Sequence, residues 1–401
     1  MDTLPLDWVI VAGGFHDHGA MDRANAALAR HLEARGARVH LVGHEIDRAF
    51  QGARIVRHEV RRPRGAAPLA EALLSRRGMK VAAQVTGAAP HARVVVNGGN
   101  CPWPDVNWVH AVHAAWPVCD EGAPPWLRVK HRSLKSLHRR HERRALRAAR
   151  TVIVNSDATR RAVVDGGLAS PDIVHTVYLG SDESWARATT AERSAARDWL
   201  GVPPGEPLVA FVGALGFDVN KGFDVLWEAW RRLSASADWR AWLVVAGGGG
   251  RLPEWQHAAA AGPSGARVRF LGQTTWVRQV LAAADLLVSP VRYDAYGLNV
   301  QEALCRGAAV MVSTGAGIAE RLAGQLDEAL LPPDLPGAAL ADRLQAWSRD
   351  VDGWRERAAC MGARLQRRSW DDMAADIVAI ANGVRHAAGT PVPAPASLAR
   401  A

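Results

Sequence analysis

The chain has 401 residues, of which 48% are hydrophobic and 22% charged, a balance typical of globular proteins. Its four scattered cysteines, none in a C-x-x-C pair, exclude a zinc ribbon and fit a reducing compartment better than a disulfide framework. The acidic first residues do not resemble a signal peptide, and no apolar run approaches the ~20 residues of a spanning helix. We therefore expect a cytoplasmic protein of two or three domains, with peripheral membrane attachment as the one other option.

The formal net charge of +9 is unevenly distributed. Residues 1–180 contain 26 Lys and Arg against 16 Asp and Glu, whereas residues 181–401 contain 23 against 24. This asymmetry predicts that only the first half meets an anionic ligand or surface. Only four of the 49 bases are lysine, so an arginine-rich genome would also explain part of the excess.

Two segments begin alike, with a short apolar run, a glycine-containing loop and a helical pattern. They are residues 8–12 followed by a helix around 25–32, and residues 208–212 followed by a helix over 223–233. Strands that alternate with helices predict an α/β fold with two doubly wound, Rossmann-like parallel-sheet domains. Further strands are expected, in chain order, at residues 38–42, 93–96, 107–109, 151–154, 174–178, 242–246, 268–271, 286–289 and 309–313.

Domain boundaries follow from composition. We expect an N-terminal domain at 1–182, a Gly-, Pro- and Ser-rich linker at 183–206 and a C-terminal domain at 207–368. The Pro- and Ala-rich tail at 386–401 is expected to be disordered.

Residues 292–320 (RYDAYGLNVQEALCRGAAVMVSTGAGIAE) contain two acids, Asp294 and Glu302, eight positions apart around a Tyr-Gly-Leu core. This segment resembles the E-x7-E donor-site signature of the retaining family 4 glycosyltransferases, which have the GT-B fold of two domains facing across a cleft. Other segments extend the resemblance in the C-terminal half: residues 211–213 and 220–224 resemble the phosphate-binding turn, and residues 268–272 resemble the nucleobase strand. In the N-terminal half, residues 19–25 resemble the glycine loop, and residues 152–156 and 177–182 resemble the usual segments before the linker. Residues 369–385 resemble the closing helix, which packs back on the N-terminal domain.

The resemblance implies a role for each matching residue. Lys221 and the loop at Gly19 would hold the diphosphate, Glu302 the ribose, and Asp294 and His110 the transferred sugar. His110, Asp294 and Lys221 are the expected catalytic residues, and the expected donor-binding residues are Gly19, Ala20, Gly213, Lys221, Gln273, Asp294, Gly297, Leu298, Asn299, Val300 and Glu302.

Elementary chemistry agrees with these roles. A departing diphosphate requires fixed positive potential, and Lys221 precedes a helix whose free N–H groups also favour phosphate. Each residue also has a structural explanation: Lys221 as a solvent-facing turn residue, Glu302 as a partner of the helix dipole and Asp294 as a turn former. His113 is the alternate to His110 at the end of the same strand.

The sequence departs from the family pattern at two positions. Ala214 stands where an Arg commonly completes an Arg–Lys pair on the diphosphate, and Arg292 or Arg23 would have to substitute. Asp294 in place of Glu shortens the reach by one methylene group. One cation fewer predicts weaker stabilisation of the leaving diphosphate, and the alternative is a weakly active or inactive homologue.

Residues 128–150 contain ten Lys and Arg and a single acid, Glu142. This segment predicts either a basic helix on an anionic lipid surface or a solvated face of the domain, and without interleaved aromatics nucleic acid is not expected. Four tryptophans gather in the expected acceptor region, where core packing is the default and stacking on a sugar or a lipid interface is the alternative; they are Trp103, Trp108, Trp116 and Trp126.

These observations predict a retaining glycosyltransferase that moves a sugar from a UDP- or GDP-linked donor to a glycan or lipid-linked acceptor. Cell-envelope or exopolysaccharide synthesis is the expected setting. No cofactor and no obligatory metal are expected, since no D-x-D motif lies in the expected cleft. The alternatives are a GT-B epimerase or phosphorylase, and a catalytically weak or inactive GT-B homologue that binds sugar nucleotides or associates with a membrane.

Overall fold

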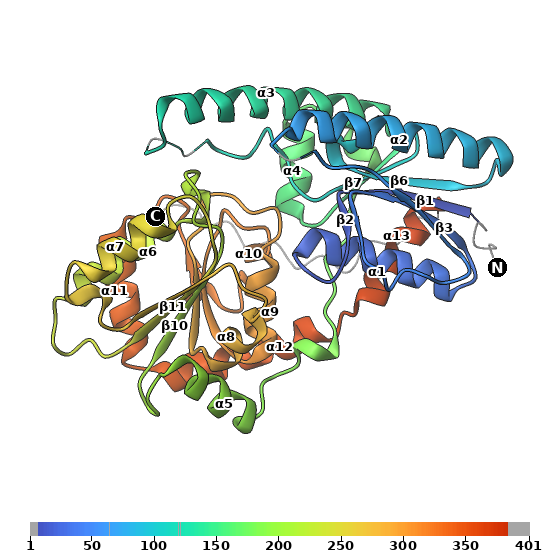
Figure 1. Cartoon of the computed structure of the whole chain (residues 1–401). Helices are drawn as coiled ribbons and strands as arrows, with labels where there is room; N and C mark the ends of the chain where they lie inside the picture. The colour runs from blue at the N-terminus through green and yellow to red at the C-terminus, as the bar shows by residue number, and fades with distance from the viewer. Residues whose placement is uncertain (1–6, 64, 119, 121, 384–401) are drawn as a thin grey trace, which may run out of the picture.

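The computed structural model describes residues 7–63, 65–118, 120 and 122–383 (Figure 1). Two large sheets, each made only of parallel strand pairs, form the centres of two α/β bodies. The expected fold class is confirmed. The expected disordered tail at 386–401 lies outside the described residues.

The N-terminal sheet has seven strands, in the order β5-β3-β1-β6-β7-β8-β9. Its central strand β1 pairs with β3 and β6, so that Val9 lies opposite His40 and Val94. The bounds are β1 (Asp7–Val11), β3 (Arg38–Gly43), β5 (Ile55–Glu59), β6 (Arg93–Asn97), β7 (Val106–Val109), β8 (Thr151–Val154) and β9 (Val174–Thr176), with the two-residue strands β2 (Gly14–Phe15) and β4 (Glu45–Ile46) paired beside the sheet.

The C-terminal sheet has six strands, in the order β12-β11-β10-β13-β14-β15. Their bounds are β10 (Leu208–Val212), β11 (Trp242–Ala246), β12 (Val268–Gly272), β13 (Leu286–Ser289), β14 (Ala309–Ser313) and β15 (Leu330–Leu331). The central strands β11, β13 and β14 are buried throughout, because helices cover both faces of a doubly wound sheet.

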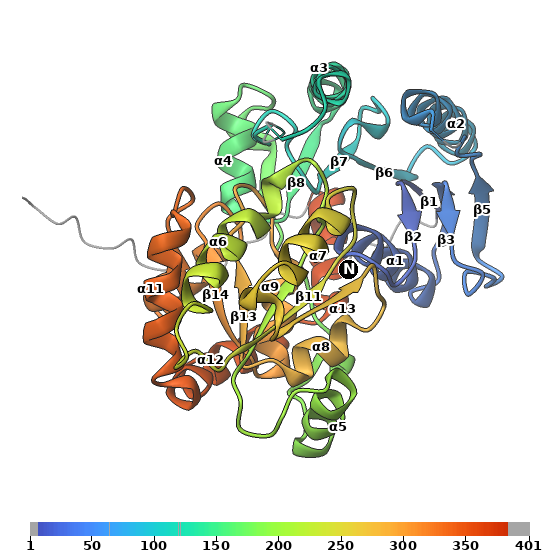
Figure 2. The same cartoon turned by 60° about the vertical axis from the view of Figure 1, so that its left-hand side comes forward.

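Helices cover the sheets as Figures 1 and 2 show. In Figure 1, α2 and α3 lie along one face of the N-terminal sheet, and α1 and α13 lie on the other. The helices are α1 (Ala20–Ala34), α2 (Ala67–Ala88), α3 (Pro125–Ala148), α4 (Asp157–Asp165), α5 (Thr190–Leu200), α6 (Phe223–Leu233), α7 (Leu252–Ala260), α8 (Val277–Ala283), α9 (Leu298–Arg306), α10 (Ala319–Leu322), α11 (Gly337–Ser348), α12 (Val351–Gln366) and α13 (Trp370–Ala381). Short 3-10 helices are η1 (Gly98–Asn100), η2 (Pro171–Ile173), η3 (Glu183–Trp185), η4 (Val219–Lys221), η5 (Pro263–Gly265) and η6 (Asp327–Ala329).

The chain crosses between the two bodies twice, and the two crossings are hydrogen-bonded to each other. The Ser181 N–H donates to the Arg368 carbonyl at 2.8 Å, and the Trp370 N–H donates to the Ser181 carbonyl at 3.2 Å. A Cβ on Gly180 would lie 2.4 Å from the Ser369 carbonyl oxygen, so only glycine permits this approach. After the second crossing, α13 packs against α1 in the N-terminal body.

Most predicted strands match the structure to within two residues, and two kinds of strand were not predicted. The helix expected around residues 25–32 begins earlier, at Ala20, and the strand expected at 174–178 ends at Thr176. The edge strand β5 (IVRHE) was missed because it is polar and only half-buried. The two-residue strands β2, β4 and β15 are too short to produce a pattern. No helix in the described part of the chain is both long and apolar enough to span a membrane.

Candidate active site

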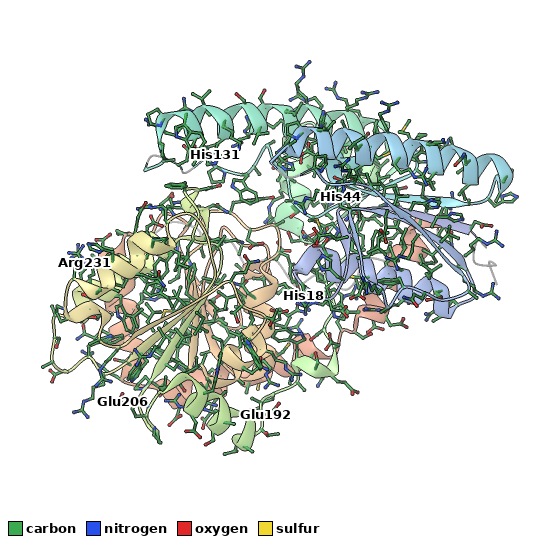
Figure 3. The ribbon with its side chains drawn as sticks, viewed as in Figure 1. His18, His44, His131, Glu192, Glu206 and Arg231 are labelled. Atoms are coloured by element: carbon green, nitrogen blue, oxygen red, sulfur yellow. The ribbon has the colours of Figure 1, made fainter. Side chains whose placement is uncertain are left out.

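A cavity of about 1020 Å³ lies at the carboxyl ends of both sheets and takes its lining from both bodies. His110 and Asn155 follow strands of the N-terminal sheet, while Gly213 and Gln273 follow strands of the C-terminal sheet. The N-terminal ends of α1 and α9 also line the cavity, as does His18, which Figure 3 shows on the side of the N-terminal body that faces the other. Such crevices are the usual ligand sites of open α/β sheets.

The structure brings all but one of the predicted site residues to this cavity. The exception is Val300, whose side chain is fully buried in the core and whose N–H donates to the Gly297 carbonyl. The predicted residues that line the cavity are Gly19, Ala20, His110, Gly213, Lys221, Gln273, Asp294, Gly297, Leu298, Asn299 and Glu302.

Lys221 and Asp294 form an ion pair in the wall of the cavity, with Nζ 2.6 Å from Oδ2. Lys221 ends η4, and Gly222 follows with φ +74°, which lets the chain turn into α6. The Asp294 N–H donates to the Gly315 carbonyl at 3.0 Å, so the acid is held by its backbone. The pair thus offers a cation for phosphate and an acceptor for sugar hydroxyls at adjacent positions.

Glu302 and Arg23 form a second ion pair that joins the two bodies, with Oε1 2.7 Å from Nη2. Glu302 lies on α9, just after the first turn of the helix, and its side chain is buried. Burial raises the pKa of the Glu302 carboxyl to about 7, although the Arg23 charge opposes the shift. The guanidinium of Arg23 also lies over the rings of Trp185 and Trp370, at 5.3 and 5.9 Å from their centroids.

Arg292, one of the two candidates to replace the missing arginine, is engaged elsewhere. Its guanidinium makes two hydrogen bonds to the Asp224 carboxylate, at 3.0 and 2.7 Å, and one to the Val219 carbonyl. Arg292 is not among the residues that line the cavity, whereas Arg23 is. Of the two candidates, therefore, only Arg23 has its side chain at the cavity.

His110, rather than His113, faces the cavity. The His110 ring lies 4.4 Å from the buried Trp108 ring, and its Nε2 is buried without a hydrogen-bond partner among the described residues. Burial lowers the pKa of His110 to about 3, so the ring is neutral at any ordinary pH. His113 turns away, and both its N–H and its Nδ1 face Oε1 of the buried Glu142, at 2.9 and 3.2 Å.

The four tryptophans of the expected acceptor region have different surroundings. Trp108 is fully buried in the core, and Trp103 packs against the cluster that includes Val9 and Val96. Trp116 Nε1 donates to Asp218 of the C-terminal body at 2.9 Å. Trp126, at the start of α3, is 67% exposed.

Sequence reasoning missed several lining residues, among them Asn155, Trp185 and Trp276. Asn155 directly follows β8, and its position at the carboxyl end of a strand could have identified it. Trp185 lies in the crossing segment and Trp276 at the start of α8, where no motif points to the cavity. Within the described residues, no three His, Cys, Asp or Glu side chains are grouped as metal ligands would be.

The two bodies and the cavity between them define the class of protein. The structure is similar to WaaG, a glycosyltransferase involved in lipopolysaccharide biosynthesis, with a TM-score of 0.73 and 19% identity over 93% of this chain and 99% of that one. It is also similar to Anabaena HepE in complex with UDP and glucose, with a TM-score of 0.63 and 17% identity over 94% of this chain and all of that one. The fold is GT-B.

Two family models match the sequence: "Glycosyltransferase Family 4" over residues 21–185 and "Glycosyl transferases group 1" over residues 206–350. The chain belongs to the family 4, group 1 glycosyltransferases.

Curated relatives are similar over part of their length. A D-inositol 3-phosphate glycosyltransferase of Nocardia farcinica is 33% identical over 44% of this chain and 40% of its own length. An alpha-maltose-1-phosphate synthase of Mycolicibacterium smegmatis is 30% identical over 58% of this chain and 63% of its own length. The similarity to these two relatives therefore spans about half of their length.

Proposed function

We propose that this protein is a retaining glycosyltransferase that transfers a sugar from a nucleotide-diphosphate sugar, UDP- or GDP-linked, to a glycan or lipid-linked acceptor. The observation that carries the proposal is the cavity in which two acids, Asp294 and Glu302, each face a base. A sugar nucleotide presents hydroxyls to be accepted and a diphosphate to be neutralised, which is the complement of such a site.

The transfer needs no covalent intermediate on the protein. The bond between the sugar C1 and the diphosphate oxygen breaks, the acceptor oxygen bonds to C1 from the same face, and the acceptor proton passes to the departing phosphate. Lys221 would stabilise the charge that develops on the diphosphate. Neutral His110, with its free Nε2, would orient a hydroxyl of the sugar or acceptor rather than remove its proton.

The related proteins support the choice of substrates. One structural neighbour was solved with UDP and glucose, another takes part in lipopolysaccharide biosynthesis, and curated relatives are a glycosyltransferase and a synthase of phosphorylated sugars. We propose that the protein acts in cell-envelope or exopolysaccharide synthesis on the cytoplasmic side of a membrane. We also propose that the transfer needs no obligatory metal. The second candidate, a catalytically weak homologue, is favoured by Ala214 in place of an arginine.

Thermal stabilisation by UDP, GDP, ADP and their sugars tests the proposal. A ligand at 100 times its Kd adds about 2.7 kcal/mol to the free energy of unfolding. We expect one nucleotide class to stabilise the wild type, and Lys221→Ala and Glu302→Ala to abolish the effect. Lys80→Ala, which removes an exposed lysine of α2, is the matched control and leaves the effect intact.

Sugar transfer or donor hydrolysis with the stabilising nucleotide sugar then separates the two candidates. Turnover supports the transferase, and binding without turnover supports the weak homologue. If no nucleotide stabilises a protein that melts cooperatively, the donor-site proposal is wrong.

We propose further that α3 brings the protein to an anionic membrane surface. Five arginines and Ser136 line a shallow groove of about 600 Å³ along the helix, and in Figure 3 nitrogen-tipped side chains project outward from it; the arginines are Arg139, Arg140, Arg143, Arg144 and Arg147. At its N-terminal end Trp126 and Val129 are 67% and 65% exposed, the combination of apolar anchors and positive charge found in interfacial helices.

Sedimentation with vesicles tests this surface. We expect binding to phosphatidylglycerol vesicles but not to phosphatidylcholine vesicles, and loss of binding in Arg140→Glu/Arg144→Glu. Arg231→Glu is the control, since Arg231 is an exposed base on α6 of the other body (Figure 3). Equal binding to both lipids, or equal loss in the control, would show that α3 is an ordinary solvated face.

A further inference from the structure

We infer that Arg23, on the N-terminal body, is the second diphosphate-binding cation of this site and replaces the arginine absent at position 214. The inference rests on the proposed function and identifies a residue of that same site. Its consequence is that the two cations reach the diphosphate from opposite sides of the cleft, Lys221 from the C-terminal body and Arg23 from the N-terminal one.

The first step is the inventory of positive charge at the cavity. Three Lys and Arg residues are among its described lining residues: Arg23, Lys221 and Arg278. Arg278 is exposed and lies on α8, directly after the loop that follows the expected nucleobase strand β12. Arg23 instead lies in the first turn of α1 and Lys221 just before α6, at helix ends where free N–H groups favour phosphate.

The second step is the state of the Arg23 guanidinium. Its side chain is only 13% exposed, it faces Glu302, and its Nε has no hydrogen-bond partner among the described residues. A buried guanidinium has five N–H donors, and one carboxylate oxygen cannot satisfy them. Arg23 therefore retains donors for a ligand that enters the cavity, and two phosphate groups would supply the missing acceptors.

The third step is the positioning of the side chain. The rings of Trp185 and Trp370 lie beside the guanidinium, and these residues come from the first crossing segment and from α13. Arg23 is thereby held where α1, α9 and both crossings meet. Because its rotamers are restricted before a ligand arrives, little side-chain entropy remains to be lost on binding.

The fourth step is the pairing of charges. Two acids of the site each face a base, Asp294 with Lys221 and Glu302 with Arg23, at 2.6 and 2.7 Å. In the bound state, the acids would turn to the hydroxyls of the sugar and ribose while the bases turn to the diphosphate. The two pairs thus place donors and acceptors side by side, and a ligand with hydroxyls and a diphosphate satisfies all four groups.

The test compares the Kd of the stabilising nucleoside diphosphate for wild type, Arg23→Gln, Ala214→Arg and the double variant, by calorimetry at pH 8.5. We expect Arg23→Gln to bind roughly 10- to 100-fold more weakly, as the loss of a charge-assisted contact implies. We expect Ala214→Arg to restore the affinity of the double variant to within threefold of wild type. Arg231→Gln, which removes an exposed arginine of α6 outside the cavity, is the control and changes the Kd by less than threefold.

A merely structural role of Arg23 has a different signature. If Arg23 only positioned Glu302, Arg23→Gln would lower the affinity for nucleoside mono- and diphosphates equally. An arginine at position 214 would then not restore binding. Either result overturns the inference, as does wild-type affinity in Arg23→Gln. A wild type that binds none of the nucleotides instead contradicts the proposed function itself.

Discussion

Glu302 predicts a specific pH dependence of donor binding. Because the pKa of its carboxyl is about 7, the side chain is about one-tenth ionised at pH 6 and about nine-tenths ionised at pH 8. Only the ionised form offers two acceptors to a ribose, so we expect affinity for the donor to rise about tenfold between these values, or about 1.4 kcal/mol. The measurement is the Kd of a nucleotide sugar, whose diphosphate diester has no ionisation of its own in this range.

Two variants make the interpretation specific to Glu302. Glu302→Gln removes the ionisation, so its affinity is expected to be low and the same at pH 6 and pH 8. Arg23→Gln removes the charge that lowers the Glu302 pKa, so the midpoint of the transition moves to higher pH. A wild-type Kd that stays within twofold between pH 6 and pH 8 would refute a ribose contact by a carboxylate with this pKa.

Three further outcomes are expected from single substitutions. His110→Ala lowers kcat by roughly 10- to 100-fold and leaves the shape of the pH profile unchanged, because the ring is neutral throughout; a change confined to KM would contradict an orienting role. Gly222→Ala destabilises by roughly 3 kcal/mol or more in urea unfolding, since its φ is +74° and the new Cβ would lie 1.9 Å from the Pro290 carbonyl oxygen. Glu320→Gln weakens the N-terminal cap of α4, where the carboxylate accepts the Asp157 N–H at 2.7 Å, and costs about 1 kcal/mol; an unchanged urea midpoint would exclude it.

The fold could be predicted because its determinants are local. Strands such as β10, β11 and β14 are short, mainly apolar runs, and each is followed by glycine or a polar loop at the edge where ligands bind. Most residues of the site could be predicted for the same reason, since Gly213, Lys221 and Asn299 lie directly after strands or at the starts of helices. The few residues around each of them are enough to predict such a place.

The pairing of side chains could not be predicted. Glu302 was expected to face only the ribose, but its partner Arg23 is 279 positions away and reaches it across two bodies. The same holds for Tyr293, whose hydroxyl accepts the Val112 N–H at 2.8 Å and so connects the loop of His110 to the C-terminal body. Such contacts depend on how the two domains are arranged, and the sequence pattern within one domain does not predict that arrangement.

The two hydrogen-bonded crossings at Ser181 and Ser369 have a mechanical consequence. A single linker would leave the domains free to rotate about three axes, whereas two segments joined by a parallel bridge resist twist and sliding. They leave one easy motion, a rotation about the line through the two crossings, and Arg23 and Glu302 belong to the two bodies that this rotation would separate. Opening and closing should therefore return these two side chains to the same register each time, which a reaction repeated over many cycles requires.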